Sequence, residues 1–517
     1  MRTKYSMLNM MVNILGQILN LILAFISRMV LVHFFTVEYL GISSLFGNIL
    51  NLLSLSELGI GIAMVYSMYA PAAAEDQERL LELFHLYRRL YRIVALVVAV
   101  CGMALLPFLD ILVKESSQIE HLHFYYLLFL SHSVCSYLFA YKTSLITVHQ
   151  KQYIVNLYTQ TFVIIRYVLQ ILFLYITRNF TLYLMIQIGT TITSGYLAAR
   201  RAEKMYPYIK EKSNVLPPEK QRRAIYKNIG AMSLHKIGEV LINYTDNLML
   251  SAFIGLSSVG IYSNYKLISS NLEHFVYLTI SSVTASVGNL GVSESRDKIY
   301  DVYKTLNFLG YACYSYSTAL MGVLFTPFIR LAFGNNFLLP ASTVLLILAD
   351  FYMRGMRQVT QCFRDGMGIF WNYRYKSLVE AFINLTVSLC LVGQWGITGV
   401  LTGTVVSFAI TSFWIEPMVL LRYGIKDHWK RRLLEYFIKY IGNTAAMCLC
   451  GLAVWLVCSI FPMENLGWII LGGVAGSGVY FFAFLLIFGR TREFRNLKET
   501  GYGFFKLAMA KVAERRR

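Results

Sequence analysis

Runs of about 20 apolar residues recur along the whole chain, and short polar connections separate them. A helix rises about 1.5 Å per residue, so about 20 such residues cross the hydrocarbon core of a bilayer. We predict about fourteen spans, at residues 8–33, 40–66, 87–113, 121–147, 152–177, 180–200, 226–254, 259–288, 303–326, 338–361, 371–393, 396–422, 434–461 and 466–489. The pattern therefore predicts an all-α polytopic membrane protein.

One apolar run, residues 227–255, carries polar and charged side chains at depths where charge is costly. They are Asn228, His235, Lys236, Glu239, Asn243 and Asp246. At about 100° per residue, most of them fall on one face of a helix. Lys236 and Glu239 could simply neutralise each other at i,i+3. For the whole face we favour a water-filled cavity, because intramembrane ionisable groups avoid lipid.

A short pattern occurs twice, 219 residues apart. Residues 40–44 (LGISS) resemble residues 259–263 (VGIYS), and the loop at 75–79 resembles 294–298 at the same offset. That offset aligns polar positions of the first span with those of the seventh: Asn9 with Asn228, Asn20 with Glu239, and Ser27 with Asp246. An even number of spans between equivalents makes the repeats parallel, related by an axis along the membrane normal.

The repeat predicts two pseudo-symmetric six-helix lobes around a central cavity, plus an additional C-terminal helix pair. The predicted parts are an N-lobe (1–203, helices 1–6), a cytoplasmic linker (204–224), a C-lobe (225–432, helices 7–12), a helix pair (433–490, helices 13–14) and a basic cytoplasmic tail (491–517). The candidate cavity residues are Asn9, Asn13, Asn20, Arg28, Asn48, Asn51, Arg166, Asn228, His235, Lys236, Glu239, Asn243 and Asp246. Two such lobes suggest alternating access around a midplane site.

Composition agrees with a membrane protein, since 56% of the residues are hydrophobic and only 15% are charged, against about 25% in soluble proteins. The formal net charge of +19 would suggest nucleic acid in a soluble chain. Here the basic residues collect in the loops that follow even-numbered spans. The positive-inside rule then places both termini in the cytoplasm and removes the need for a nucleic-acid partner.

Motifs for other chemistry are missing from the sequence. The eight cysteines form no metal-ligand pattern with histidine and no disulfide framework. The sequence has no Walker A motif and no convincing nucleophile constellation, so we expect neither ATP hydrolysis nor enzymatic catalysis. We therefore predict no catalytic residues, no metal site and no cofactor.

The first apolar run continues past the length of a signal peptide and has no small-residue cleavage site, which favours a transmembrane helix.

Residues 75–92 predict an amphipathic helix at the cytoplasmic surface, with Asp76 as its N-cap. We expect its apolar side chains to face lipid: Leu80, Leu83, Phe84, Tyr87 and Tyr91.

Several segments resemble the bacterial polysaccharide-repeat-unit (Wzx-type) flippases of the multidrug/oligosaccharidyl-lipid/polysaccharide (MOP) exporter superfamily, whose fold is MATE-like. They are EYLGISSLFGNIL (38–50), SELGIGIAMVYSMY (56–69), YTDNLMLSAFIGLSSVGIYSNYKLI (244–268) and NLTVSLCLVGQWGITGVLTGTVVS (384–407). The resemblance covers essentially the whole chain. It implies a flippase that moves an undecaprenyl-diphosphate-linked oligosaccharide to the outer leaflet of the bacterial cytoplasmic membrane for surface polysaccharide biosynthesis. The implied partners are that lipid-linked oligosaccharide, membrane lipids and the polysaccharide-assembly machinery.

A diphosphate needs cationic partners, and arginine suits phosphate because it can bind in a bidentate way. The candidates are Arg28, Arg354, Arg357 and Arg364. The last three arginines could equally help to set the membrane topology or contact anionic lipid. Coupling to H⁺ or Na⁺ stays open, as do two other functions: an ion-coupled multidrug exporter of the same superfamily, and a membrane polysaccharide polymerase. Intramembrane arginines disfavour the exporter of cations, and short outer loops disfavour the polymerase.

Overall fold

The structure, a computed structural model, describes residues 2–57, 60–114, 119–149, 151–210, 216–281, 287, 294–369 and 375–499. Within these ranges the regular elements are helices and none is a strand. By packing, the chain forms two compact units. Unit 1 comprises Met1–Ser263 and Val392–Val400, and unit 2 comprises Asn264–Leu391 and Leu401–Arg517. The predicted lobe boundaries stay a prediction.

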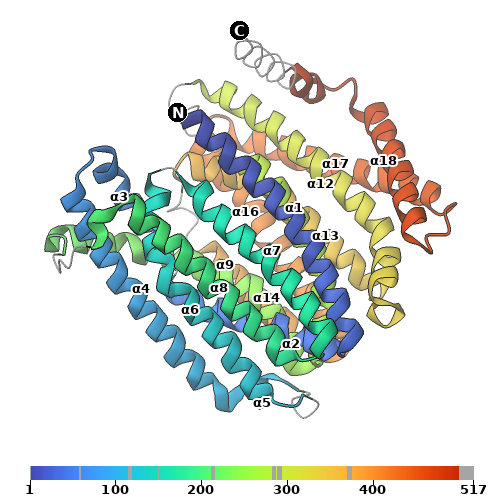
Figure 1. The fold of residues 1–517 in the computed structure, drawn as a ribbon. Coiled ribbons are helices and arrows are strands. Elements are labelled where there is room, and N and C mark those ends of the chain that lie inside the picture. The colour runs from blue at the N-terminus through green and yellow to red at the C-terminus, as the bar shows by residue number, and fades with distance from the viewer. Residues whose placement is uncertain are drawn as a thin grey trace, which may run out of the picture. The chain divides into compact units, whose positions relative to one another are not determined.

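Unit 1 is a bundle of long helices (Figure 1). Its elements are α1 (Arg2–Phe34), α2 (Val37–Leu53), η1 (Ser54–Glu57), α3 (Ile60–Ala73), α4 (Gln77–Leu105), η2 (Leu106–Phe108), α5 (Leu109–Leu112), α6 (Leu122–Val148), α7 (Gln152–Thr177), α8 (Phe180–Met205), η4 (Pro207–Lys210), α9 (Glu219–Phe253) and the start of α10 (Leu256–Ser281). Helix α1 packs on α7, α6 on α4 and α8, and α9 on α2 and α3.

Unit 2 holds the remaining elements. They are the rest of α10, α12 (Arg296–Phe333), η5 (Asn335–Phe337), α13 (Ala341–Gly366), α14 (Lys376–Trp395, up to residue 391), α15 (Ile397–Ile410, from residue 401), α16 (Ser412–Val419), η7 (Leu420–Ile425, a π-helix), α17 (Trp429–Cys458) and α18 (Leu466–Phe488). Helix α12 packs against α13, α17 and α18, and α17 and α18 lie side by side as an antiparallel pair (Figure 1).

The described residues of the fourteen predicted spans fall on helices or runs of helices, so the all-α polytopic fold is confirmed. Eight described segments are long and apolar enough to cross a membrane: Gly16–Phe34, Gln77–Leu112, Gln152–Thr177, Arg296–Phe333, Lys376–Trp395, Ile397–Ile425, Trp429–Cys458 and Leu466–Phe488. Several other helices carry buried polar side chains, for example Asp350 and Gln358 on α13. Their mean hydropathy is lower because their polar faces pack against protein.

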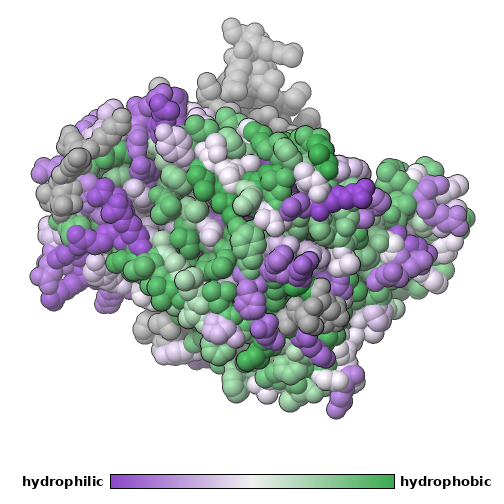
Figure 2. All heavy atoms as spheres, turned by 60° about the horizontal axis from the view of Figure 1, so that its bottom comes forward, coloured by the Kyte–Doolittle hydropathy of each residue, from purple (hydrophilic) through white to green (hydrophobic). Residues whose placement is uncertain are grey.

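Much of the molecular surface is apolar, as expected for helices that face lipid. Figure 2 shows apolar side chains over much of the face in view, with hydrophilic side chains gathered in patches. Large hydrophobic residues stand exposed on the helices, such as Leu96 on α4, Ile441 on α17 and Leu486 on α18. Hydrocarbon accepts such side chains without the cost they would carry in water.

Two predicted spans are broken in the structure. The span at 40–66 contains α2, the 3₁₀ turn η1 and α3, and the span at 396–422 contains α15, α16 and the π-helix η7. Pro417 lies inside α16, and proline removes a helical hydrogen bond. At the break, the Thr411 hydroxyl donates to the carbonyl of Ser407 (2.6 Å) and the Trp414 indole N–H donates to that of Ile410 (2.6 Å). These side chains satisfy backbone groups that lipid cannot.

The amphipathic segment at 75–92 differs from its prediction in one respect. Asp76 is the N-cap of α4, as predicted, and its carboxylate accepts from the backbone N–H of Arg79 (3.0 Å). However, Leu80, Leu83 and Phe84 are buried, as are the tyrosines that follow them on the same face. The expectation that this face meets lipid is therefore wrong: α4 is one continuous helix, and it packs against α3 and α6.

The two copies of the repeated pattern contact each other inside unit 1. Gly41 on α2 and Gly260 on α10 are equivalent positions, and a Cβ added at Gly260 would lie 3.2 Å from the backbone nitrogen of Gly41. Glu38 and Ser257 are also equivalent, and the serine hydroxyl donates to the carboxylate (2.6 Å). Contact between equivalent residues is what a two-fold axis produces. The packing thus agrees with the pseudo-symmetry inferred from the repeat.

Gly41→Ala is expected to destabilise the protein, because the new Cβ would lie 2.9 Å from the backbone carbonyl carbon of Leu256. Overpacking of this kind costs about 1–3 kcal/mol. Gly47→Ala on the same helix is the matched control, since its Cβ meets nothing within 4 Å and alanine favours a helix. Thermal unfolding in detergent should show a lower midpoint for Gly41→Ala only. Equal midpoints for the two variants would contradict the close approach.

Candidate functional site

Three predicted cavity residues lie on α1 and α7, which pack together in unit 1. The Asn20 amide donates to Gln160 on α7, and the missing side chain at Gly16 leaves room for Gln160. Arg28 is half-buried and donates to the Ser263 hydroxyl (3.0 Å). Arg166 is also half-buried and stacks on the Tyr167 ring, 4.7 Å from its centroid.

The two arginines belong to one polar cluster. The Tyr183 hydroxyl interacts electrostatically with Arg166, Arg28 and Tyr167. The ring of His132 lies near Arg166 and pairs with the Thr191 hydroxyl (2.9 Å). Nε of Arg166 is buried and has no hydrogen-bond partner among the described residues, and no described carboxylate forms an ion pair with this arginine. A buried cationic donor without an acceptor is costly, so this cluster suits an anion. We call Arg28, Arg166, Tyr167 and Tyr183 the arginine cluster.

The structure also positions other predicted cavity residues. Asn48 is half-buried on α2, Asn51 is exposed near its end, and Asp246 is buried on α9. The remaining predicted side chains lie outside the described part of the chain: Asn9, Asn13, Asn228, His235, Lys236, Glu239 and Asn243. Their role stays a prediction.

The three candidate phosphate-binding arginines of unit 2 lie on α13, and each has a carboxylate partner. Arg354 Nε donates to Asp350 Oδ1 (2.6 Å), and Asp350 also contacts Lys266 (3.4 Å). Arg357 contacts Glu416 (2.9 Å), and Arg364 contacts its neighbour Asp365 (2.7 Å). A phosphate would have to displace these carboxylates, which makes the three arginines weaker candidates than Arg166.

A buried ion cluster surrounds Arg357, and sequence reasoning missed most of it. Lys376 on α14 contacts Glu380 one turn later and Glu416 on α16 (3.0 Å). Glu380 also accepts from the Ser412 hydroxyl (2.8 Å). Both glutamates and the lysine are nearly inaccessible. The sequence does contain one indication of this cluster, because Glu416 is the single acidic residue within the apolar run 396–422. An unpaired carboxylate is costly in a membrane span, so a cationic partner could have been expected.

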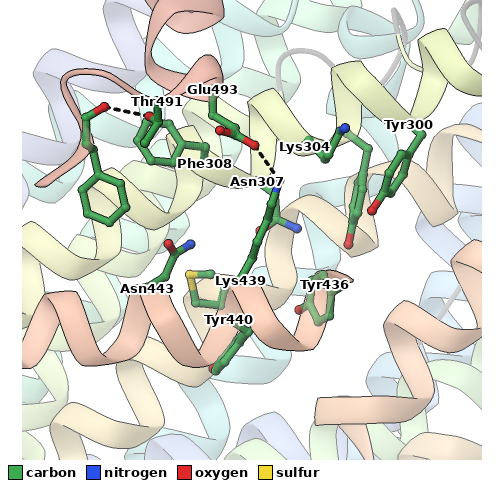
Figure 3. Close-up of a pocket in the computed structure, with 13 residues that line it drawn as sticks. Tyr300, Lys304, Asn307, Phe308, Tyr436, Lys439, Tyr440, Asn443, Thr491 and Glu493 are labelled. Carbon is green, nitrogen blue, oxygen red and sulfur yellow. Dashed lines mark hydrogen bonds and ion pairs between the residues drawn. The ribbon is translucent and has the colours of Figure 1, made fainter. Parts of the chain in front are cut away.

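Unit 2 also contains a cavity of about 200 Å³ between α12, α13, α17 and the segment after α18 (Figure 3). Lys439 and Glu493 both line it and form an ion pair (2.5 Å). Burial raises the pKa of Glu493, but the hydrogen bond and charge of Lys439, a backbone hydrogen bond and the charge of Lys304 together outweigh burial, and the pKa lies below its ordinary value. This contact therefore stabilises the fold above the ordinary pKa of glutamate and is lost as pH falls through the lowered one.

No described group of three or more His, Cys, Asp or Glu side chains is arranged to hold a metal ion. The polar sites of the described chain are therefore an arginine cluster in unit 1 and, in unit 2, a neutralised ion cluster and a mixed polar cavity.

Comparison with known proteins gives the fold. No family model matches the chain, and no curated protein matches its sequence. The lipid II flippase MurJ in an inward closed conformation matches with a TM-score of 0.63 at 14% identity, over 93% of this chain and 99% of that one. An inward-facing multidrug resistance MATE transporter of the MOP superfamily matches with a TM-score of 0.58 at 13% identity, over 78% and 94% of the two chains. A mutant of the Vibrio cholerae MATE transporter VcmN scores 0.53 at 14% identity, over 83% and 99%. The chain therefore has the fold of MOP-superfamily transporters.

Glu416→Gln should strongly destabilise the protein, because it leaves Arg357 and Lys376 with less compensating charge in a buried site. Breaking a buried ion pair costs about 3–5 kcal/mol. The control is Glu219→Gln, which removes an exposed i,i+4 partner of Arg223 and should cost less than about 1 kcal/mol. Thermal unfolding in detergent measures both. An unchanged midpoint for Glu416→Gln would show that the cluster does not hold α13, α14 and α16 together.

Proposed function

We propose that this protein is a flippase of the Wzx type, which moves an undecaprenyl-diphosphate-linked oligosaccharide from the inner to the outer leaflet by alternating access. The observation that carries the proposal is the arginine cluster, in which Arg166 has a buried donor and no described carboxylate partner. A diphosphate supplies the missing acceptors, and the neighbouring tyrosines can exchange hydrogen bonds with sugar hydroxyls.

The extent of the structural matches favours a lipid-linked substrate. The lipid flippase leaves only about 36 residues of this chain unmatched, that is 7% of 517. The α17–α18 pair with its connection spans residues 429–488 and is longer than that, so at least part of it is matched. The multidrug transporter leaves 22% of this chain unmatched. We expect this helix pair to contribute a groove for the lipid tail.

An apolar cavity of unit 2 fits the same expectation. It has a volume of about 410 Å³ and lies between α12, α13, the α15–α16 break and α17. Its lining includes Leu345, Leu348, Met353 and Met447, with few polar groups. An isoprenoid chain offers only apolar surface, and a cavity of this composition can receive it.

Multidrug export is the second candidate, because the matching structures include multidrug resistance transporters. A site for cationic drugs should present carboxylates or aromatic rings. The arginine cluster presents two guanidinium groups instead, which would repel a cation. A membrane polysaccharide polymerase has no comparable support.

We further propose that the protein lies in the bacterial cytoplasmic membrane with both termini in the cytoplasm. We also propose that it contacts membrane lipids and the polysaccharide-assembly machinery, and that H⁺ or Na⁺ couples its cycle.

Deletion of the protein followed by a leaflet assay tests the function directly. If the proposal holds, the lipid-linked oligosaccharide accumulates where only cytoplasmic-side reagents reach it, and re-expression restores its outer-leaflet exposure. Normal outer-leaflet exposure together with increased sensitivity to cationic dyes would favour the multidrug exporter.

Arg166→Gln should slow flipping about 10-fold or more, because a charge-assisted hydrogen bond is worth about 1.5–3 kcal/mol. Arg28→Lys should also slow flipping, since lysine keeps the charge but loses bidentate geometry. Arg178→Gln is the control, because Arg178 is exposed at the end of α7 outside the cluster. The rate at which the lipid-linked sugar reaches the outer leaflet, divided by the amount of protein in the membrane, is the measurement. Wild-type rates for both cluster variants would remove the phosphate-binding role.

A further inference from the structure

The 200 Å³ cavity of unit 2 has a mixed lining that the proposed function does not use (Figure 3). Tyrosine and phenylalanine rings, two lysines, two asparagines, a threonine and a glutamate face it. The polar members labelled in Figure 3 include Lys304, Asn307, Lys439, Asn443, Thr491 and Glu493. Its volume equals that of about six to seven liquid waters, at about 30 Å³ each, which is enough for a small polar headgroup.

The charges around this cavity are balanced. Lys304 contacts Asp301 (2.9 Å), and Lys439 contacts Glu493 (2.5 Å) and Glu435 (3.1 Å). Arg492 adds a further cation beside Asp301 (3.7 Å), so three cations face three carboxylates. A ligand with net charge would leave one partly buried charge uncompensated. A ligand that carries one positive and one negative group can exchange partners with these ion pairs and keep the balance.

The positive-inside rule places the cavity near the depth of lipid headgroups. Lys304 is eight residues from the start of α12 and Lys439 ten from the start of α17, or about 12–15 Å along each axis. Thr491 and Glu493 follow directly after the end of α18. The same ends carry the basic loops that the positive-inside rule assigns to the cytoplasm. Beside the cavity, α17 and α18 expose apolar side chains, including Ile438, Ile441 and Leu486.

We infer that this cavity binds a membrane phospholipid with a zwitterionic amine–phosphate headgroup, and we call it the headgroup pocket. The phosphate accepts hydrogen bonds from Lys304, Lys439 and the asparagine amides. The ammonium group pairs with Glu493 and lies against tyrosine rings, which attract cations. The acyl chains follow the exposed apolar faces of α17 and α18. Such a lipid ties α17 and the segment after α18 to α12, and this inference does not depend on which substrate is flipped.

Lipid binding to the purified full chain in detergent tests the inference. The probes are phosphatidylethanolamine, phosphatidylglycerol with the same acyl chains, and soluble O-phosphoethanolamine. Native mass spectrometry and thermal unfolding should show that phosphatidylethanolamine binds and raises the midpoint, with at least tenfold tighter binding than phosphatidylglycerol. Soluble O-phosphoethanolamine should neither bind at comparable concentration nor raise the midpoint, because it has no acyl chains.

Two variants locate the binding. Lys439→Gln removes a phosphate donor, and Asn443→Leu fills the cavity while it leaves the ion pairs intact. Both should weaken phosphatidylethanolamine binding about tenfold or more, whereas Lys430→Gln, an exposed lysine of α17 outside the cavity lining, should not. Equal binding of phosphatidylglycerol would overturn the zwitterion assignment. Undiminished binding in Asn443→Leu, no binding of either lipid, or tight binding of soluble phosphoethanolamine would each overturn the headgroup pocket.

Discussion

The hydrocarbon environment requires each polar group of a spanning helix to find its partner inside the protein, and the rest of this structure follows from that constraint. Where α15 ends at Ile410, the Thr411 hydroxyl and the Trp414 indole donate to backbone carbonyls beside the break. Where charged residues enter the interior, they gather into clusters such as Lys376, Glu380 and Glu416. The large apolar side chains are then free to face outward, as Figure 2 shows.

Close backbone approach is the second determinant of the architecture. Gly41 and Gly260 let the first turns of α2 and α10 come into backbone contact, which any side chain would prevent. Because the two glycines are repeat equivalents, the same requirement for a small residue applies on both sides of the contact. The Glu38–Ser257 hydrogen bond joins a second pair of equivalent positions, which carry different side chains.

The lengths of the apolar runs predicted where the helices lie, because about 20 apolar residues leave few alternatives in a bilayer. Hydropathy did not predict the helix breaks at Ser54–Glu57 and Thr411, because it does not depend on the direction of the backbone. It misassigned the apolar face of α4, because a face that packs on α3 and α6 has the same composition as one that meets lipid. Of the candidate site, the sequence pointed to Arg28 and Arg166 but could not pair Lys376 with Glu416, which are 40 residues apart.

An arginine that already forms an ion pair with a carboxylate must give up that pair to bind a phosphate. Existing ion pairs therefore decide which arginines suit a phosphate. Arg354 and Arg357 already have carboxylates at 2.6 and 2.9 Å, and separating a buried pair costs several kcal/mol before any new bond forms. Arg166 has no such pair to break within the described chain, so an incoming phosphate gains the full interaction. Under the proposed function the site must also release the anion, and the tyrosines of the arginine cluster are neutral neighbours that remain beside the two cations once the anion leaves. The compensated sites of unit 2 suit permanent structure or a neutral ligand, and the arginine cluster of unit 1 suits a transient anion.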